Sequence, residues 1–142
     1  MEEKIIKVLI EDEFAKENGI YFSKLEGDNL VFKMPIKSQH RNPLGLVHGA
    51  VLFALADEVS GYFCSQVLEK PSVTLSSSIN YIKGSQAKEI QSETRLIQNT
   101  SSISLIEVSI FDENKELLAI CNMTYYKLKN FEEKRKNYET GR

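Results

Sequence analysis

One carboxylate stands out in this sequence because it interrupts a segment that otherwise looks suited to complete burial. Residues 48–68 predict a helix with apolar side chains on most of its sides, and Asp57 lies near its middle. A buried carboxylate is costly unless it is paired or hydrogen-bonded. On a helical wheel, Asp57 lies off the stripe that should face a sheet, among small or apolar neighbours. The wheel alone leaves two readings open, a structural polar network and a group that does chemistry.

The start of the same helix offers a second chemical group. The first backbone N–H groups of a helix lack partners within it and lie at the positive end of its dipole, so they can polarise a carbonyl oxygen or stabilise an oxyanion. Gly49 occupies this position, where the missing side chain lets a ligand approach the backbone. Asp57 lies about 12 Å further along the helix, at about 1.5 Å per residue. If both groups act on one reacting bond, they most simply come from two subunits related by a two-fold axis.

The elements that must position these groups follow from the spacing of apolar residues. Residues 3–17 predict a short amphipathic helix that stops at Gly19, and residues 20–36 predict a hairpin. A loop with Pro43 and Gly45 leads into the central helix. Beyond that helix, alternating apolar residues predict four strands joined by turns, over residues 72–84, 88–98, 101–111 and 116–128.

The order of these elements predicts an α+β fold in which one antiparallel sheet wraps around one long central helix, because an apolar helix beside a single sheet must be covered. The turns favour a four-strand meander. Glu58 lies on a side of the helix where we expect solvent. Residues 131–142 are charged and weakly periodic, so a solvated tail is favoured over a frayed helix, and residues 1–130 form the one predicted domain. The stripe that should face the sheet consists of Leu52, Leu55, Ala56, Val59 and Phe63.

Composition excludes several classes of function. The chain has 142 residues, of which 42% are hydrophobic and 27% charged, with a formal net charge of −2. The chain has no excess of basic residues that would attract nucleic acid or an anionic membrane surface. No segment approaches the ~20 consecutive apolar residues of a membrane-spanning helix. Cys64 and Cys121 lack CxxC spacing and fit a reducing cytosol, which predicts a cytoplasmic protein. With His40 and His48 as the only histidines, we expect no metal site and no cofactor.

Three short motifs together resemble the hotdog-fold thioesterases, specifically the phenylacetic-acid-degradation (PaaI) type. They are Asn42, the run Gly45-Leu46-Val47-His48-Gly49, and Leu55-Ala56-Asp57. That family shows an Asn, then Gly-x-x-His-Gly-Gly, then a helix bearing Leu-x-Asp, and the resemblance covers about residues 14–128. It implies a hotdog fold and an acyl-CoA thioesterase that is a homodimer or dimer of dimers, with sites at the subunit interface. The family's second glycine is Ala50 here, which puts the shape of the acyl pocket in question.

The resemblance implies a role for five residues. The family's helix aspartate acts as general base or nucleophile on the thioester, which corresponds to Asp57. Its glycine N–H at the helix start polarises the thioester carbonyl, which corresponds to Gly49. Its loop Asn and His orient the thioester and the water, matching Asn42 and His48. A Ser or Thr at the start of the next strand, on the partner subunit's side of the site, helps to hold the water, and Thr74 occupies that place.

Plainer readings stay open for these residues. His48 can be an ordinary helix-start histidine, and Asn42 can serve the turn that contains it. Thr74 shares its strand face with Ser76, opposite Tyr81, and can simply face solvent.

Two further features lie near the predicted site. The turn Lys83-Gly84-Ser85 either contacts the phosphates of a ligand, since a lysine beside a pocket pairs with them, or is only a solvated turn. Cys64 lies near Asp57 on the wheel, but a buried, inert cysteine is a better reading than a thiol nucleophile.

These observations favour an acyl-CoA thioesterase whose partners are its acyl-CoA substrate and a second copy of itself. The alternative is a non-catalytic acyl-CoA-binding hotdog module, such as a ligand-sensing domain. The presence of Asp57 together with Asn42 and His48 favours the enzyme. A hotdog dehydratase would need a histidine paired with an acid in a different loop–helix motif, which the sequence lacks.

Overall fold

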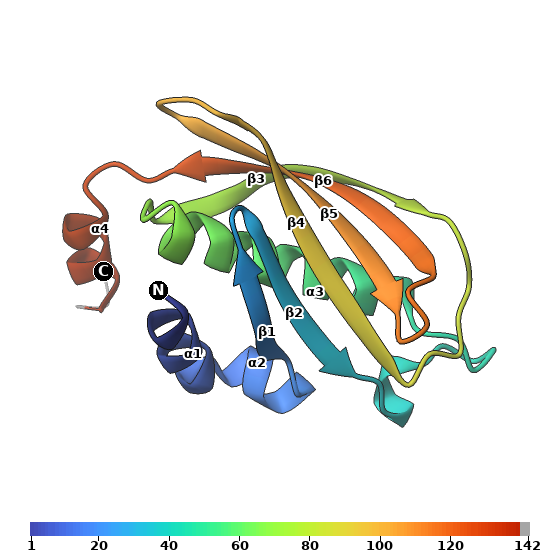
Figure 1. The fold of residues 1–142 in the computed structure, drawn as a ribbon. Coiled ribbons are helices and arrows are strands. Elements are labelled where there is room, and N and C mark those ends of the chain that lie inside the picture. The colour runs from blue at the N-terminus through green and yellow to red at the C-terminus, as the bar shows by residue number, and fades with distance from the viewer. Residues whose placement is uncertain (140–142) are drawn as a thin grey trace.

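The computed structural model describes residues 1–139 and has a six-stranded antiparallel sheet around one central helix (Figure 1). The predicted α+β fold, with one sheet wrapped around one long helix, is confirmed. The helices and strands in chain order are α1 (Glu2–Glu11), α2 (Glu13–Asn18), β1 (Tyr21–Glu26), β2 (Asn29–Pro35), a 3-10 turn (Ser38–His40), α3 (Gly49–Tyr62) continued by a π-helical turn (Phe63–Val67), β3 (Ser72–Tyr81), β4 (Glu89–Asn99), β5 (Ile103–Asp112), β6 (Leu117–Lys127) and α4 (Phe131–Glu139).

The central helix packs its predicted stripe against the sheet. Leu52, Leu55, Ala56, Val59 and Phe63 are all 4% exposed or less, and α3 contacts strands β2 to β6. Replacing such a buried leucine by alanine costs about 2–5 kcal/mol. The stripe therefore holds α3 firmly, and the groups on the other sides of the helix have fixed positions.

The strand order corrects the predicted four-strand meander. The sheet runs β1-β2-β4-β5-β6-β3, so β3 lies at the far edge beside β6, and β4 pairs with β2. Residues 82–88 form an extended connection in place of the predicted turn. Along it, the Ile82 N–H donates to the Leu118 carbonyl, and the Ser85 carbonyl accepts from the Val47 N–H. This connection between β3 and β4 is too long for a tight hairpin. It takes the chain from one edge of the sheet to the edge of β2, with which β4 pairs.

Strand β3 is an edge strand whose side chains are mostly exposed. Val73, Leu75 and Tyr81 are 48%, 58% and 55% exposed. The register with β6 shifts between Thr74 and Ser76, and such a bulge reverses the alternation of faces. Thr74 and Tyr81 therefore both contact α3, so the prediction that they lie on opposite faces is wrong.

Asp12 divides the predicted N-terminal helix into two short helices. Its backbone is extended, and its side chain accepts a hydrogen bond from the Ala15 N–H at 3.1 Å, which caps α2. Gly19 ends α2 in the left-handed conformation with φ of 68°, at the predicted stop. Helix α1 buries Ile5 and Leu9 and packs against β1. The two helices are thus fastened to the first strand of the sheet.

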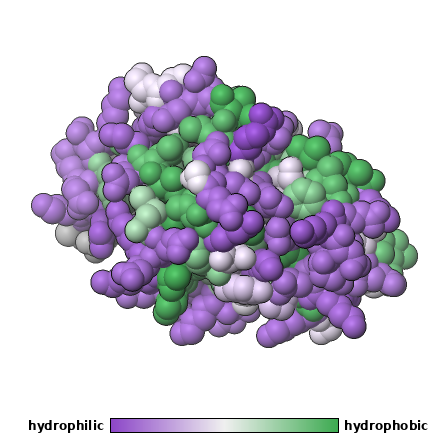
Figure 2. Space-filling model, viewed as in Figure 1, coloured by the Kyte–Doolittle hydropathy of each residue, from purple (hydrophilic) through white to green (hydrophobic). Residues whose placement is uncertain are grey.

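The end of the chain differs from the favoured prediction of a solvated tail. Residues Phe131–Glu139 form α4, whose described side chains are exposed or half-buried. Residues 140–142 lie outside the described residues, and the domain boundary at residue 130 stays a prediction. Over residues 1–139, no helix is long and apolar enough to cross a membrane. The face shown in Figure 2 is mainly hydrophilic, with its apolar residues gathered in separate patches.

Candidate active site

Six of the eight predicted site residues line two clefts at different points along α3, while His48 and Ser85 line neither. The first, of about 350 Å³, lies between α3 and the start of β3 and contains Asp57 and Thr74; we call it the Asp57 cleft. The second, of about 240 Å³, lies at the N-terminal end of α3, and we call it the Gly49 cleft. The predicted residues in its lining are Asn42, Gly49, Lys83 and Gly84. Within one chain, the predicted base is therefore separated from the predicted N–H donor.

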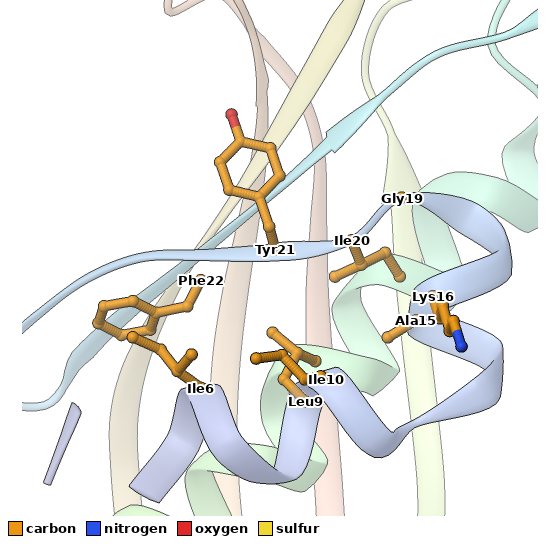
Figure 3. Close-up of a pocket in the computed structure, with 9 residues that line it drawn as sticks. All are labelled: Ile6, Leu9, Ile10, Ala15, Lys16, Gly19, Ile20, Tyr21 and Phe22. Atoms are coloured by element: carbon orange, nitrogen blue, oxygen red, sulfur yellow. The ribbon is translucent and has the colours of Figure 1, made fainter. Parts of the chain in front are cut away.

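A larger cleft, of about 500 Å³, lies elsewhere, between the helices α1 and α2 and the strand β1 (Figure 3). Its lining is largely apolar, and Lys16 is its one charged side chain. Figure 3 shows Ile6 and Phe22 close together at one end and Lys16 at the other. None of the predicted site residues lines this cleft, so we assign it no part in the chemistry.

Asp57 is held by hydrogen bonds from two strands. Its Oδ1 accepts from the Thr74 hydroxyl at 2.7 Å and from the Tyr125 hydroxyl at 2.6 Å. The helical wheel shows Asp57 only among small and apolar neighbours, because these partners come from β3 and β6 and not from α3. Thr74 was expected on the partner subunit's side of the site, but in this chain it contacts the aspartate of its own subunit. The structure thus brings two of the five predicted residues into direct contact.

Tyr125 is a residue of this site that sequence reasoning missed. Its side chain is 2% exposed, and its hydroxyl also lies 2.7 Å from the main-chain oxygen of Asp57. Burial, and then the hydrogen bond to Asp57, raises the pKa of Tyr125, so this hydroxyl stays neutral and acts as a donor. A buried tyrosine hydroxyl needs a partner, but only the pairing of β6 with β3 reveals which one it has.

Glu58 does not face solvent, so that prediction is wrong. It is half-buried beside Asp12, the residue that caps α2. Burial, followed by the hydrogen bond to Asp12, raises the pKa of Glu58 to about 8. Burial by itself would also raise the pKa of Asp12. Hydrogen bonds from Glu58, the Ala15 N–H and Tyr62 outweigh burial, so the pKa of Asp12 is lowered. At neutral pH, Glu58 is therefore a protonated donor to an ionised Asp12, and both line the Asp57 cleft.

Gly49 is the first residue of α3, and its N–H has no acceptor within the helix. The Tyr81 ring packs directly over it: a Cβ at Gly49 would lie 3.1 Å from two ring carbons. The Tyr81 hydroxyl also donates to the Gly49 carbonyl at 3.1 Å. A side chain at this position would therefore push the Tyr81 ring aside by a few tenths of an ångström, so packing alone favours a small residue here.

His48 caps α3. Its Nδ1 accepts a hydrogen bond from the Ala50 N–H at 3.2 Å, and the side chain is exposed. In the neutral ring this acceptor role places the proton on Nε2. The plainer reading of His48 as a helix-start residue is thus confirmed, and its Nε2–H is left as a donor toward solvent.

Asn42 organises the loop before α3. Its side-chain oxygen accepts from the Leu44 N–H at 3.0 Å and from the Leu46 N–H at 3.1 Å. The turn role of Asn42 is therefore confirmed. In the described part of the chain its amide nitrogen donates no hydrogen bond to a protein group, and this NH₂ is the part of the side chain that can contact a ligand in the Gly49 cleft.

The predicted phosphate-binding segment is occupied by contacts within the chain. Lys83 Nζ pairs with Glu116 Oε1 at 2.6 Å on the surface. A Cβ at Gly84 would lie 3.0 Å from Leu46. The Ser85 hydroxyl accepts from the Ala87 N–H at 3.0 Å. Lys83 and Gly84 border the Gly49 cleft, and their role toward a ligand stays a prediction.

Cys64 is fully buried, and burial raises the pKa of its thiol to about 12. A thiol in this state does not supply a thiolate nucleophile near neutral pH. Among the side chains that the structure describes, no three from His, Cys, Asp or Glu are grouped as a metal site would require. The two clefts thus offer a carboxylate, which can act as a base or a nucleophile, and a helix-start N–H, which can stabilise an oxyanion.

The sequence is similar to proteins that are named as thioester hydrolases. The model of the Thioesterase superfamily matches residues 44–119, more than half of the chain. The 1,4-dihydroxy-2-naphthoyl-CoA hydrolase of Escherichia coli is 27% identical over 108 residues, which cover 74% of this chain and 79% of that protein. The protein of the same name in Listeria monocytogenes is 24% identical over 108 residues, covering 75% and 88% of the two chains.

Solved structures share the fold. Thioesterase HI1161 of Haemophilus influenzae superposes with a TM-score of 0.83 at 21% identity and covers 90% of each chain. The PaaI protein of Escherichia coli superposes with a TM-score of 0.81 at 19% identity, covering 89% of this chain and 92% of that one. The protein smu.793 of Streptococcus mutans, solved with acetyl CoA bound, gives a TM-score of 0.71 at 23% identity, covering 77% and 88%. This chain belongs to the thioesterase superfamily and is a thioester hydrolase of the hotdog fold.

Proposed function

We propose that this protein hydrolyses acyl-CoA thioesters at a site shared by two subunits, with Asp57 from one subunit and Gly49 from the other. The observation that carries this proposal is the separation of the two groups into two clefts of one chain, about 12 Å apart along α3 by helix geometry. A thioester carbonyl cannot meet both groups within one subunit. Two antiparallel copies of α3 related by a two-fold axis bring the Asp57 cleft of each copy to the Gly49 cleft of the other.

The surface of β3 supports a second copy of the chain as the partner. This edge strand has one unpaired side and carries exposed apolar side chains at Val73, Leu75 and Tyr81. A long exposed edge strand of this kind promotes aggregation in a protein that remains a monomer. Since β3 also borders both clefts through Thr74 and Tyr81, covering it with a second copy closes the site at the same time. The assembly is a homodimer or a dimer of dimers.

The proposed reaction moves one proton and breaks one carbon–sulfur bond. Asp57 takes a proton from water, and the water oxygen attacks the thioester carbon. The carbonyl oxygen gains negative charge, which the Gly49 N–H stabilises. The carbon–sulfur bond then breaks, and the proton held by Asp57 passes to the leaving sulfur, giving the free acid and CoA. In the nucleophilic variant of this scheme, the Asp57 carboxylate attacks the carbon, the carbon–sulfur bond breaks and the anhydride forms as the CoA thiolate leaves. Water then hydrolyses the anhydride, which gives the free acid, restores the carboxylate and supplies the proton for the CoA thiol.

The loop before α3 supports the finer assignment to the PaaI type, which we propose. The Asn42 NH₂ and the His48 Nε2–H are both unused donors beside the helix start, and they are suited to orient the thioester and the water. The names of two relatives and the acetyl CoA bound to a structural neighbour support CoA thioesters as the substrate class. Two buried free cysteines support a reducing, cytoplasmic location.

One observation favours the alternative of a non-catalytic acyl-CoA-binding module. Asp57 is hydrogen-bonded to Thr74 and Tyr125, so a structural network accounts for a carboxylate at this position without any chemistry. The two functions separate in one experiment, a panel of acyl-CoA thioesters with detection of the released thiol, run on the wild type and on Asp57→Asn. The enzyme predicts turnover that Asp57→Asn loses, with binding retained. The binding module predicts thioester binding and no turnover in either protein.

A further inference from the structure

The two oxygens of the Asp57 carboxylate have different surroundings. Oδ1 accepts from the Thr74 hydroxyl at 2.7 Å and from the Tyr125 hydroxyl at 2.6 Å. No described side chain or backbone group donates a hydrogen bond to Oδ2. A carboxylate oxygen has about two lone-pair directions, so both directions on Oδ1 are in use and those on Oδ2 are open toward the cleft.

We infer that Tyr125 is a positioning residue that anchors Asp57 through Oδ1 and leaves Oδ2 as the oxygen that takes the proton from water. This inference rests on the proposed hydrolysis at Asp57 and adds the residue and the atom that make the carboxylate effective. Tyr125 lines the same cleft but is only 2% exposed, and its hydroxyl is directed at Asp57, so we assign it to holding the carboxylate and not to contact with the water or the thioester.

An anchor matters because an aspartate is free to turn at its last torsion angle. The χ2 angle of aspartate has a broad distribution, which lets the two oxygens exchange places. A general base must lie within about 2.6–3.2 Å of the proton that it accepts. Tyr125 contacts both the side chain and the main-chain oxygen of Asp57, so it ties the carboxylate to its own turn of α3. Thr74 holds the same oxygen from β3, and the two contacts together fix the plane of the carboxylate.

Other titratable groups surround this pair and decide how the test is run. Asp12, Glu58 and Tyr62 line the same cleft, and Cys64 lies on the buried side, near Tyr125. Burial keeps the pKa of Glu58 near 8, so Glu58 adds a negative charge beside Asp57 only as the pH rises toward that value. The variants are therefore compared between pH 4 and 7, where the charge of Glu58 changes little.

The test is the variant Tyr125→Phe, which removes the hydroxyl and keeps the ring. We expect kcat to fall by about 10- to 100-fold, the scale for a misplaced catalytic group, with KM nearly unchanged. The acidic limb of the kcat/KM profile should move to higher pH, because the carboxylate loses a donor that favours its ionised form. Tyr126→Phe removes a hydroxyl from the next residue of β6, outside both clefts, and serves as the matched control with wild-type kinetics.

A second pair of variants separates positioning from a merely structural role. Thr74→Val removes the other donor to Oδ1, while Thr74→Ser keeps it. Both donors hold one oxygen, so Tyr125→Phe should lower kcat by a smaller factor in the Thr74→Val background than in the wild type. In the Thr74→Ser background, Tyr125→Phe should again lower kcat by the full wild-type factor.

Two outcomes contradict the inference. In the first, Tyr125→Phe stays within two-fold of the control in kcat while Asp57→Asn is inactive; the proposed function then stands and the anchor does not. In the second, Tyr125→Phe loses activity together with its thermal transition, and its pH profile does not move, which makes the hydroxyl a folding contact only. An active Asp57→Asn would instead overturn the proposed function itself.

Discussion

The two proposed site regions of α3, at Gly49 and at Asp57, are built in different ways. At the Gly49 end, two motif residues have local partners, since His48 caps the helix and Asn42 holds its own turn, while Gly49 makes room for Tyr81 of β3, 32 residues further on. At Asp57, the partners come from strands that lie far away in the sequence, with Tyr125 68 residues further on. The first region shows that a motif residue can have a structural reason and still leave a donor free for a ligand. The second shows that a carboxylate that looks isolated on a helix can accept two short hydrogen bonds from strands.

The largest effect is expected at Asp57. Asp57→Asn should lower kcat by at least about 100-fold, since an amide does not accept the proton of water. The fold should survive, because the Tyr125 hydroxyl keeps the main-chain oxygen of residue 57 as a partner. Steady-state kinetics and calorimetric binding of a CoA thioester check both points. If the kcat of Asp57→Asn lies within a few-fold of the wild-type value, Asp57 is not the catalytic base.

The next largest effect is expected at the helix start. Gly49→Pro removes the N–H, and proline is tolerated at the first position of a helix. Gly49→Ala keeps the N–H but adds the same Cβ, 3.1 Å from the Tyr81 ring, so it is the matched control. We expect Gly49→Pro to lose about 100- to 1000-fold in kcat relative to Gly49→Ala, the scale for one oxyanion donor. Equal losses in the two variants would mean that Gly49 serves packing alone.

A smaller effect separates the two functions of Asn42. Asn42→Asp keeps an oxygen for the Leu44 and Leu46 N–H groups but removes the NH₂. Its melting temperature should stay near that of the wild type, while kcat/KM falls about 3- to 10-fold, as expected for one lost hydrogen bond. Asn42→Ala should lose both stability and activity. If Asn42→Asp is fully active, the side chain serves only the loop.

The smallest effect concerns stability and pH. The folded pKa of Glu58 is about 8, above its ordinary value of 4.5, so the folded chain holds this proton more tightly than the unfolded chain does. The stabilisation is complete below pH 4.5 and is lost as the pH rises toward 8. Asp12 does not offset this loss of stability, because its pKa is lowered from 3.8 and it therefore changes the pH dependence of stability only in more acidic solution.

Urea unfolding of the wild type should therefore show a free energy that falls between pH 5 and pH 8.5. Glu58→Gln keeps a donor to Asp12 without the titration, so its curve should be flatter over this range. Glu17→Gln on the exposed side of α2 is the control and should follow the wild type. Parallel curves for wild type and Glu58→Gln would show that Glu58 titrates as an ordinary surface carboxyl.

Much of the fold could be predicted from the sequence because its signals are local. The apolar stripe of α3, the hairpin β1–β2 and the alternation of β4, β5 and β6 each depend on a few neighbouring residues. The position of β3 depends on long-range pairing: nothing in its own residues distinguishes β6 from β4 as its neighbour. The bulge after Thr74 is a second such case, since it moves Tyr81 onto α3 and changes which side chains face the site.

The candidate site divides in the same way. Asp57, Gly49, Asn42 and His48 could be proposed from a motif, because the motif places them by spacing along one loop and one helix. Tyr125 could not, since an alternating strand of apolar and aromatic residues carries no sign of which ring reaches α3. The Asp12–Glu58 pair was missed because Asp12 reads as an ordinary polar residue between two helical segments.

The most direct test of the shared site is complementation between two inactive subunits. Asp57→Asn and Gly49→Pro chains, carrying different affinity tags, are expressed together, and the mixed dimer is purified. In a shared site, one of its two sites takes Asp57 from the second chain and Gly49 from the first and is intact, so the mixed dimer should regain about half of the wild-type turnover. Each pure variant should remain inactive. A mixed dimer as inactive as its parents would mean that each site lies within one subunit, and this would contradict the account.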